Sequence, residues 1–532
     1  MKISGERRNL RCLLVVIAAL GWTATGRSAE PAARPQLWFA TDFDGTNALG
    51  DWSGAGTLAE GYQSSRGLRV ERPAVSTSSA AMMVRQLPVA EVRGCTILAS
   101  ARIRAEGVSV PPQTWNGIKF MVALAGSGQK TWPQARLGTG SFDWQRVAFS
   151  VRVPEDATSA NLYLGLEEVT GTVWFDDVKL VVQGRPRPRP APVAGPMYKG
   201  HSLPRLRGTM VGSDIDAAGL KVLGRDWNAN LIRWQLIRSA KDGASNLGSD
   251  YEEWLASALK RFDAILPACE EAGLMVVLDL HSPPGGKATP GGYYGSDDRL
   301  FTDPKAQEQF VEVWRRIATR YRATPAIWGY DLANEPVEEW VDEGCDDWHT
   351  LAERTARAIR AIDPARTLIV EAPPWGSPDS LAEFTPLAVS NVVYSAHMYV
   401  PMEFTHQGVF ERGNGPVDYP GVIKGQRWDK SALEATLAPV LRFQQRYNVH
   451  IFLGEFSAIR WAPGDSGERY LRDLTEIFES HGWDWTYHAF REWHGWSVEH
   501  GGDRTDTRPV AEPSARQRVL RHWFDQNKHP PR

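Results

Sequence analysis

The chain has 532 residues, too many for one ordinary domain and enough for two domains with separate hydrophobic cores. Its 60 basic and 63 acidic side chains give a net charge of -3. This charge creates no strong field for polyanions or anionic lipid, so nucleic acid is excluded as an expected partner.

The N-terminus has the three parts of an export signal. Basic residues at positions 2, 7, 8 and 11 precede an apolar run over residues 12–22, and small residues follow it. We predict that residues 1–29 are a cleaved signal peptide and that the mature protein is secreted or periplasmic, without membrane attachment. The apolar run is about 11 residues, too short to span a bilayer comfortably, and an uncleaved anchor is the alternative.

Cleavage of this signal would leave Cys95, Cys269 and Cys345, an odd number with wide and irregular spacing. Neither a disulfide framework nor a zinc site has this pattern. Cys269 lies on the apolar face of a predicted helix, where we expect a small buried hydrophobe.

Residues 36–183 consist of short segments in which apolar and polar residues alternate, separated by Gly, Ser, Asp and Pro. A period of two at this spacing predicts an antiparallel β-sandwich. The predicted strands lie at 37–43, 67–73, 96–105, 117–126, 145–153, 160–169 and 172–182. Residues 184–204 are then predicted to form a stiff extended linker, because alternate prolines disfavour both helix and sheet.

Residues 205–527 alternate apolar strands with amphipathic helices. Strands are predicted at 207–212, 230–236, 273–281, 327–335, 367–372, 391–400, 450–456 and 484–490, and helices at 251–272, 304–322, 346–362, 430–447, 466–481 and 514–526. Several strands are continuous apolar runs, as expected when both faces of a parallel sheet are covered. Eight strands over about 320 residues predict a closed (β/α)8 barrel rather than an open doubly wound sheet.

Polar residues stand at or just past the ends of these predicted strands. They are Arg233, His281, Asn334, Glu335, His397, Tyr399 and Glu455. The carboxyl ends of all strands meet at one rim of a barrel, so we expect these side chains to converge there. Two of them are glutamates that follow apolar runs, in IWGYDLANEP and HIFLGEFS. Because a carboxylate is costly to place beside buried strand residues, a chain that does so twice is expected to use the pair.

These motifs resemble glycoside hydrolase family 5, within the clan of retaining (β/α)8 glycosidases. The matching residues are Asn334-Glu335-Pro336 at the fourth strand, Glu455 at the seventh, Arg233 at the second, His281 at the third and His397-Met398-Tyr399 at the sixth. A lone NEP is a weak signal, but NEP with a distant GEF and ordered residues between them is specific. The resemblance covers residues 206–500.

The resemblance implies that Glu335 is the general acid/base and Glu455 the nucleophile. Physical chemistry requires the same division of roles. One carboxyl must hold a proton for the leaving alkoxide, and partial burial beside a like charge would raise its pKa. The other must stay ionised, which Arg233 within reach would favour. A separation near ~5 Å would give a covalent glycosyl-enzyme and net retention, and this mechanism requires no metal or cofactor.

The same resemblance implies substrate contacts for the remaining polar residues, and each has a structural alternative. Asn334 resembles the donor to the sugar 2-hydroxyl, or it is a turn asparagine. His397 and Tyr399, two apart on a strand, share a face. The resemblance implies that they orient the nucleophile and contact the sugar, and the alternative is a buried aromatic pair. His281 lies near the sugar or caps a structural element, and Arg233 serves the site or a structural ion pair.

The eighth strand departs from the usual family pattern, in which a tryptophan near its end forms the floor of the cleavage subsite. The run here reads DWTYHAFREWHGWSVEH. We predict that Trp493 takes this position. An alternative register would put His488 there, with Trp496 merely packing.

Residues 36–183 look similar to jelly-roll carbohydrate-binding modules, and the closing phrase TVWFDDVKL carries most of the likeness. Trp52, Tyr62, Trp115 and Trp132 are candidates for a sugar platform, because flat aromatic faces stack on sugar rings. The alternative is a support domain packed on the barrel.

Together these features predict an exported retaining glycoside hydrolase, a monomer whose partner is a β-glucan or related polysaccharide. A β-mannan, a xyloglucan or a smaller β-glycoside are alternative substrates. A catalytically inactive carbohydrate-binding protein is the alternative from another class, although such a protein has no need of two opposed carboxylates.

Overall fold

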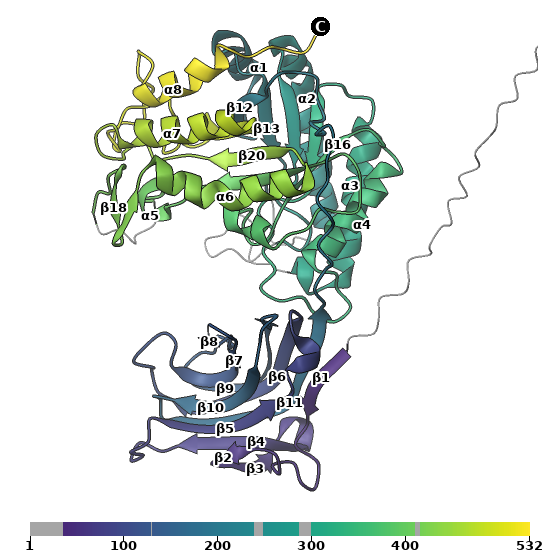
Figure 1. Cartoon of the computed structure of the whole chain (residues 1–532), viewed down its shortest axis with the longest axis vertical. Helices are drawn as coiled ribbons and strands as arrows, with labels where there is room; N and C mark the ends of the chain where they lie inside the picture. The colour runs from purple at the N-terminus through teal and green to yellow at the C-terminus, as the bar shows by residue number, and fades with distance from the viewer. Residues whose placement is uncertain (1–35, 129, 239–247, 287–298, 410–414, 532) are drawn as a thin grey trace, which may run out of the picture.

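A computed structural model describes residues 36–531 apart from 129, 239–247, 287–298 and 410–414. The predicted signal peptide lies outside the described residues. Figure 1 shows an all-β N-terminal body at the bottom and a mixed α/β body at the top, joined by an extended segment. Within the described ranges, no helix has both the length and the apolar character that crossing a bilayer requires.

The N-terminal body contains two antiparallel sheets around one apolar core. A six-stranded sheet has the order β3-β4-β11-β6-β9 with β1 paired to β11, and a five-stranded sheet has the order β2-β5-β10-β7-β8. The strands are β1 (Gln36–Thr41), β2 (Ser53–Gly54), β3 (Gly56–Glu60), β4 (Arg66–Arg72), β5 (Ala80–Leu87), β6 (Thr96–Val108), β7 (Gly117–Ala125), β8 (Lys130–Thr131), β9 (Gly140–Arg152), β10 (Ser159–Glu167) and β11 (Gly171–Gly184).

The seven strands predicted for this body are all present, but β2, β3, β5 and β8 were not predicted. The longest of these four is β5, which pairs with β10 along its whole length. Its sequence, AAMMVRQL, is rich in alanine and methionine, which have no strand preference, and it does not alternate cleanly. Pairing with β10 and burial of Met83 and Leu87 fix it as a strand.

The upper body is a closed parallel barrel of eight strands, which confirms the predicted (β/α)8 fold. Its strands are β12 (Arg207–Val211), β13 (Leu231–Gln235), β14 (Met275–Asp279), β15 (Ile327–Asp331), β16 (Thr367–Glu371), β17 (Val392–Met398), β20 (Ile451–Phe456) and β21 (Asp484–Phe490). Nearly every strand residue is buried, because helices cover the outside and side chains fill the inside. A small hairpin, β18 (Gly421–Ile423) and β19 (Gln426–Trp428), follows β17.

The helices around the barrel begin where the sequence supplies caps. Asp303, Asp347 and Asp429 each accept a hydrogen bond from a backbone N–H in the first turn of α3, α4 and α6. The helices are α1 (Ala217–Lys221), α2 (Gly248–Ala272), α3 (Pro304–Tyr321), α4 (Trp348–Arg360), α5 (Met402–Thr405), α6 (Lys430–Tyr447), α7 (Ser466–His481) and α8 (Ala515–Phe524). All six predicted helices are among them.

The N-terminal body contacts the segment between β15 and α4, at the carboxyl end of the barrel. Arg146 on β9 forms a two-pronged ion pair with Asp342, with N–O distances of 2.9 and 2.5 Å. Gln183 donates to the carbonyls of Asp342 and Cys345, each at 3.3 Å. The N-terminal body therefore lies against the segment that follows Glu335.

A buried hydrogen-bonded cluster closes the opposite end of the barrel. His201 from the linker and His450 before β20 place Nε2 2.6 and 2.7 Å from the same oxygen of Asp484. The other oxygen accepts the Leu206 N–H at 2.8 Å. Burial would raise the pKa of Asp484, but the hydrogen bonds from the two histidines lower it below its ordinary value. Asp484 is therefore a carboxylate that holds the linker against the amino-terminal ends of the barrel strands.

We expect Asp484→Asn to lower the free energy of unfolding by about 3 kcal/mol, because it replaces the buried carboxylate that both histidines contact with a neutral amide. Urea unfolding followed by tryptophan fluorescence measures the change. The depressed pKa means that the carboxylate stabilises the fold above the pKa of the unfolded chain, so the deficit should shrink as the pH falls below about 4. Asp525→Asn, at an exposed site on the end of α8, is the control and should change little. A deficit no larger than that of the control would contradict this account.

Candidate active site

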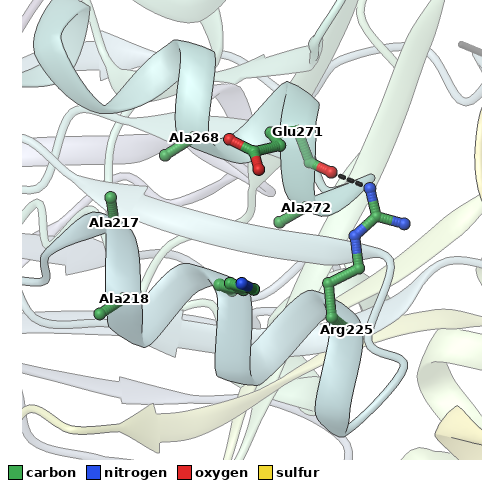
Figure 2. Close-up of a pocket in the computed structure, with 7 residues that line it drawn as sticks. Ala217, Ala218, Arg225, Ala268, Glu271 and Ala272 are labelled. Carbon is green, nitrogen blue, oxygen red and sulfur yellow. Dashed lines mark hydrogen bonds between the residues drawn. The ribbon is translucent and has the colours of Figure 1, made fainter.

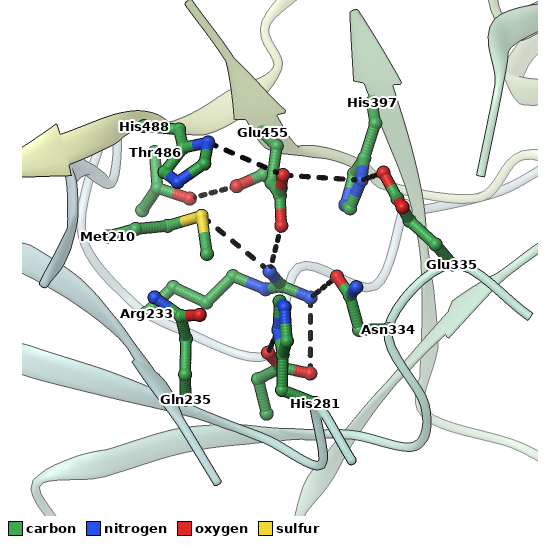
Figure 3. Close-up of polar contacts among 12 residues, drawn as sticks. Met210, Arg233, Gln235, His281, Asn334, Glu335, His397, Glu455, Thr486 and His488 are labelled. Carbon is green, nitrogen blue, oxygen red and sulfur yellow. Dashed lines mark hydrogen bonds and ion pairs between the residues drawn. The ribbon is translucent and has the colours of Figure 1, made fainter. Parts of the chain in front are cut away.

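The polar residues predicted at the strand ends come together at the carboxyl end of the barrel. Figure 3 shows Arg233, His281, Asn334, Glu335, His397 and Glu455 pointing from different strands into one space. Tyr399 joins them through its hydroxyl, which donates to Glu455 at 2.8 Å. Seven of the eight predicted site residues therefore form one connected network.

Arg233 lies at the centre of this network and is fully buried. Its guanidinium contacts Glu455 at 2.7 Å, Asp331 at 2.9 Å, Glu371 and Asn334 at 3.1 Å, and Asp279 at 3.2 Å. Burial would lower the pKa of Arg233, but the surrounding carboxylates raise it well above its ordinary value. Arg233 is therefore a permanent cation that holds acidic side chains from several strands.

Glu335 and Glu455 face each other across a short gap. Oxygen atoms of the two carboxylates and a ring nitrogen of His397 all lie within 4.8 Å of one another. His397 Nδ1 is 2.9 Å from Glu335 and 3.8 Å from Glu455. In retaining glycosidases the paired carboxyl groups are about 5–5.5 Å apart, and in inverting ones about 6.5–9.5 Å.

The surroundings of Glu455 favour its ionised form. Burial would raise its pKa, but the positive charges of His397, His488 and Arg233 outweigh burial and hold the pKa well below its usual range. The Tyr399 hydroxyl donates to the second oxygen. Glu455 is thus a carboxylate with both oxygens engaged.

Glu335 has a constrained backbone. Its φ of 45° lies in the left-handed region, which costs a residue with a side chain free energy. Its N–H donates to the buried carboxylate of Glu371 at 2.7 Å, which helps to hold this conformation. Glu371 also lies 3.0 Å from His397 Nε2, as an ion pair whose angle departs from a well-aligned hydrogen bond. Burial would lower the pKa of His397, but Glu371 and Glu455 raise it well above its ordinary value.

The buried acids Asp279, Asp331 and Glu371 were not among the residues predicted for the site. Each is the last residue of a barrel strand, β14, β15 and β16. Asp279 stands two residues before His281 and lies 2.6 Å from its Nδ1. An acid that ends an otherwise apolar strand was the signal available, since it obeys the same rule as the residues that were found.

At the eighth strand the structure places His488, not Trp493, beside Glu455. His488 Nδ1 is 2.5 Å from the Tyr399 hydroxyl and 3.8 Å from Glu455. Trp493 packs edge-on against Trp461 and Trp496, with ring centroids 5.8 and 5.5 Å apart. Trp496 in turn lies 5.7 Å from His488. The contact of Trp493 with a substrate stays a prediction.

A separate hollow lies on the outside of the barrel, where α2 passes α1 and the π-helical turn Val222–Asp226 (Figure 2). Alanines at 217, 218, 268 and 272 leave it open, and Lys221, Arg225 and Glu271 line it. Arg225 donates to the Glu271 carbonyl. No predicted site residue lines this hollow, so the strand ends are the candidate active site.

Two groups of side chains within the described ranges have the donor atoms to hold a metal ion. One is Glu335 with His397 and Glu455, the opposed carboxylates themselves. The other is His201 with His450 and Asp484, where both rings already lie at hydrogen-bond distance from one carboxylate oxygen.

Comparison with known proteins places the barrel among cellulases. The sequence profile described as Cellulase (glycosyl hydrolase family 5) matches residues 196–492. Endoglucanase C of Acetivibrio thermocellus is 28% identical over 265 residues, which cover 44% of this chain and 74% of that protein. Cellodextrinase A of Ruminococcus flavefaciens is 24% identical over 265 residues, covering 48% and 73%. The major extracellular endoglucanase of Xanthomonas campestris pv. campestris is 25% identical over 254 residues, covering 43% and 47%.

We expect Arg233→Met to destabilise the barrel by about 3–5 kcal/mol, because it leaves the Glu455 carboxylate and the buried acids beside it without their cation. Chemical unfolding measures the loss. Without Arg233 these carboxyls take up protons more readily, so the deficit should be smaller at pH 5 than at pH 7. Arg508→Met is the control, because Arg508 is 85% exposed and pairs only at the surface. A deficit that does not change with pH would show that lost packing, not charge, is the cause.

Proposed function

Because this chain belongs to glycosyl hydrolase family 5, we propose that it is an exported, retaining enzyme that cleaves a β-glucan in the manner of an endo-β-1,4-glucanase. The short gap between Glu335 and Glu455, with oxygens within 4.8 Å, carries this proposal. A gap of this size suits direct attack on the sugar and leaves no room for the water that an inverting mechanism places between carboxylate and sugar.

In the proposed reaction Glu455 attacks the anomeric carbon and forms a covalent glycosyl-enzyme, while Glu335 donates a proton to the departing oxygen. Glu335 then takes a proton from water, which releases the sugar with its configuration retained. The lowered pKa of Glu455 supports its role as the nucleophile, since the carboxylate is ionised at neutral pH. Its contacts with Arg233 and Tyr399 support an orientation suited to attack.

The remaining site residues are proposed to hold the sugar. Asn334 Oδ1 accepts a hydrogen bond from Arg233, which fixes the orientation of the side-chain amide. The amide nitrogen is the proposed donor to the sugar 2-hydroxyl. That hydrogen bond would strengthen as the ring becomes oxocarbenium-like. His281 and Tyr399 are proposed contacts on the same subsite. Trp375 is 40% exposed, and its backbone N–H donates to the carbonyl of Pro336, one residue after Glu335. Its ring is a proposed stacking contact for a second sugar.

We further propose that residues 1–29 are an export signal, 36–183 a jelly-roll carbohydrate-binding module, 184–204 a linker and 205–527 the catalytic domain of a monomer. Exposure supports two of the four aromatic candidates in the module. Trp115 and Trp132 are 58% and 56% exposed. Trp52 is 9% exposed and packs on Phe39 and Phe43, and Tyr62 lies under Arg102, so both are better explained as packing.

We expect Glu335→Gln to lower kcat/KM on a soluble β-glucan by about a thousandfold, because it removes the proton donor. The variant should keep much of its activity on an aryl β-glucoside with an acidic leaving group, which needs no proton. Added azide should rescue it and give the β-glycosyl azide. Glu455→Gln should lose activity on both substrates.

Glu339→Gln, at an exposed position of the same segment, is the matched control and should behave as the native protein. If the native protein and Glu335→Gln release reducing ends equally fast, Glu335 is not the general acid. Products of inverted configuration would end the retaining mechanism.

We expect the full-length double variant Trp115→Ala and Trp132→Ala to bind insoluble cellulose more weakly than the native protein, because two stacking faces of about 0.5–1.5 kcal/mol each are lost. Depletion of protein from solution measures binding, and activity on a soluble glucan should stay unchanged. Leu37→Ala, another exposed apolar residue of this body, is the control. Undiminished retention of the double variant would favour a support role for the N-terminal body.

A further inference from the structure

The Tyr399 hydroxyl lies between two partners that compete for its single proton. Its oxygen is 2.8 Å from Glu455 Oε2 and 2.5 Å from His488 Nδ1. Burial and the charge on Glu455 raise the pKa of Tyr399 well above its ordinary value, so it stays a neutral phenol. One O–H proton therefore serves one of two neighbours.

The acceptor to which the Tyr399 O–H points depends on whether His488 Nδ1 carries a proton. An ionised carboxylate only accepts, so the bond to Glu455 requires Tyr399 to donate to it. The short contact with His488 then requires Nδ1–H to donate to the phenol oxygen. If Nδ1 carried no proton it would be an acceptor, and Tyr399 would have to turn its O–H away from Glu455.

The far side of the ring is held by a second carboxylate. His488 Nε2 is 3.3 Å from Glu492 Oε1, and the other oxygen of Glu492 accepts from Gln235 at 2.9 Å. Burial would raise the pKa of Glu492, but the charge on His488 lowers it, so Glu492 is a carboxylate that only accepts. With acceptors at both nitrogens, the ring is satisfied only as an imidazolium.

The other charged groups around His488 oppose one another. Those facing it are Glu492 on the segment after β21, Glu455 on β20, Tyr399 after β17, Arg233 on β13 and His406 after α5, with Glu335 and His281 across the site. Burial and, more weakly, Arg233 disfavour the imidazolium, and Glu492 and Glu455 favour it, so the pKa of His488 is raised. Burial and the charge of His488 lower the pKa of His406 to about 4, so His406 adds no charge at neutral pH.

We propose that His488, charged through its pair with Glu492, is a positioning residue that directs the Tyr399 O–H onto Glu455. When His488 loses its proton to solvent, the Tyr399 hydroxyl turns to the bare Nδ1 and Glu455 loses both a hydrogen bond and a nearby positive charge. The relay Glu492–His488–Tyr399 thus confines the working form of Glu455 to pH values at which the imidazole is protonated. The catalytic consequence rests on the proposed function, whereas the proton arrangement does not.

Nitrogen NMR of the histidine rings tests the proton arrangement directly in the full chain. The His488 signal is identified by its loss in His488→Gln. At pH 7 we expect both ring nitrogens at imidazolium shifts, and in Glu492→Gln we expect titration at lower pH. Glu512→Gln, an exposed substitution, should leave the titration unchanged. A neutral His488 ring at pH 7 in the native protein would overturn the proposal, whether or not the protein cleaves a glucan.

Kinetics test the consequence for Glu455. In Glu492→Gln the alkaline limb of kcat/KM on a soluble β-glucan should move to lower pH by about one unit, the effect of removing one opposite charge at close range. Tyr399→Phe should lower kcat/KM at every pH and should remove the part of the alkaline limb that depends on His488. If Glu492→Gln lowers kcat/KM equally at all pH values and leaves the alkaline limb in place, Glu492 has a merely structural role and the proposal is overturned. If no β-glycan is cleaved by native protein with the expected ring signals, the proposed function fails and the proton arrangement stands.

Discussion

The buried guanidinium of Arg233 is the interaction on which the active site depends. Acidic side chains at the carboxyl ends of β14, β15, β16 and β20 converge on the same water-poor space, and each costs several kcal/mol to bury alone. A planar cation with several fixed donors can satisfy them from one position, which a lysine could not do. Arg233 lies on β13, which pairs with β12 and β14, so the strand pairing of the barrel also positions the guanidinium among the acids. The site is therefore preorganised by the same strand pairing that defines the fold.

The two opposed glutamates are each supported by a histidine with a second carboxylate behind it. Glu335 contacts His397, which pairs with Glu371. Glu455 reaches His488 through the Tyr399 hydroxyl, and His488 pairs with Glu492. The difference is that Glu335 lies 2.9 Å from its histidine, whereas Glu455 accepts a hydrogen bond from Tyr399 and lies 3.8 Å from His488. Two carboxylates of the same chemistry are thus given different surroundings, which is what separate roles in one reaction require.

Most of the barrel followed from the sequence because its signals are local. Continuous apolar runs, capped helices and polar residues at strand ends each depend on a few neighbouring positions. Whether Trp493 or His488 lies beside Glu455 depends instead on how β21 pairs with a strand far away in the sequence. The pairing of β21 with β12 shifts register after Tyr487, so that Phe490 pairs with Val211. Alternation counted along the strand cannot place residues beyond such an irregularity, because it depends on the partner strand. The position of Glu371 at a strand end was readable from the sequence, but its hydrogen bond to the N–H of Glu335 was not, because that contact spans 36 residues.

The start of α4 contacts both the linker to the N-terminal body and the residue that holds the backbone of Glu335. Asp347 caps α4 and pairs with Arg187 of the linker, and the next residue, Trp348, donates its indole N–H to the carbonyl of Glu371 at 2.7 Å. The side chain of Glu371 in turn holds the N–H of Glu335. The ion pairs at the interface are half-exposed and individually worth little, so docking depends on several of them acting together. Trp348 is fully buried, and it therefore gives the interface and the active site a common rigid base. A polysaccharide held by the N-terminal body would be anchored to the same base that fixes the backbone of Glu335.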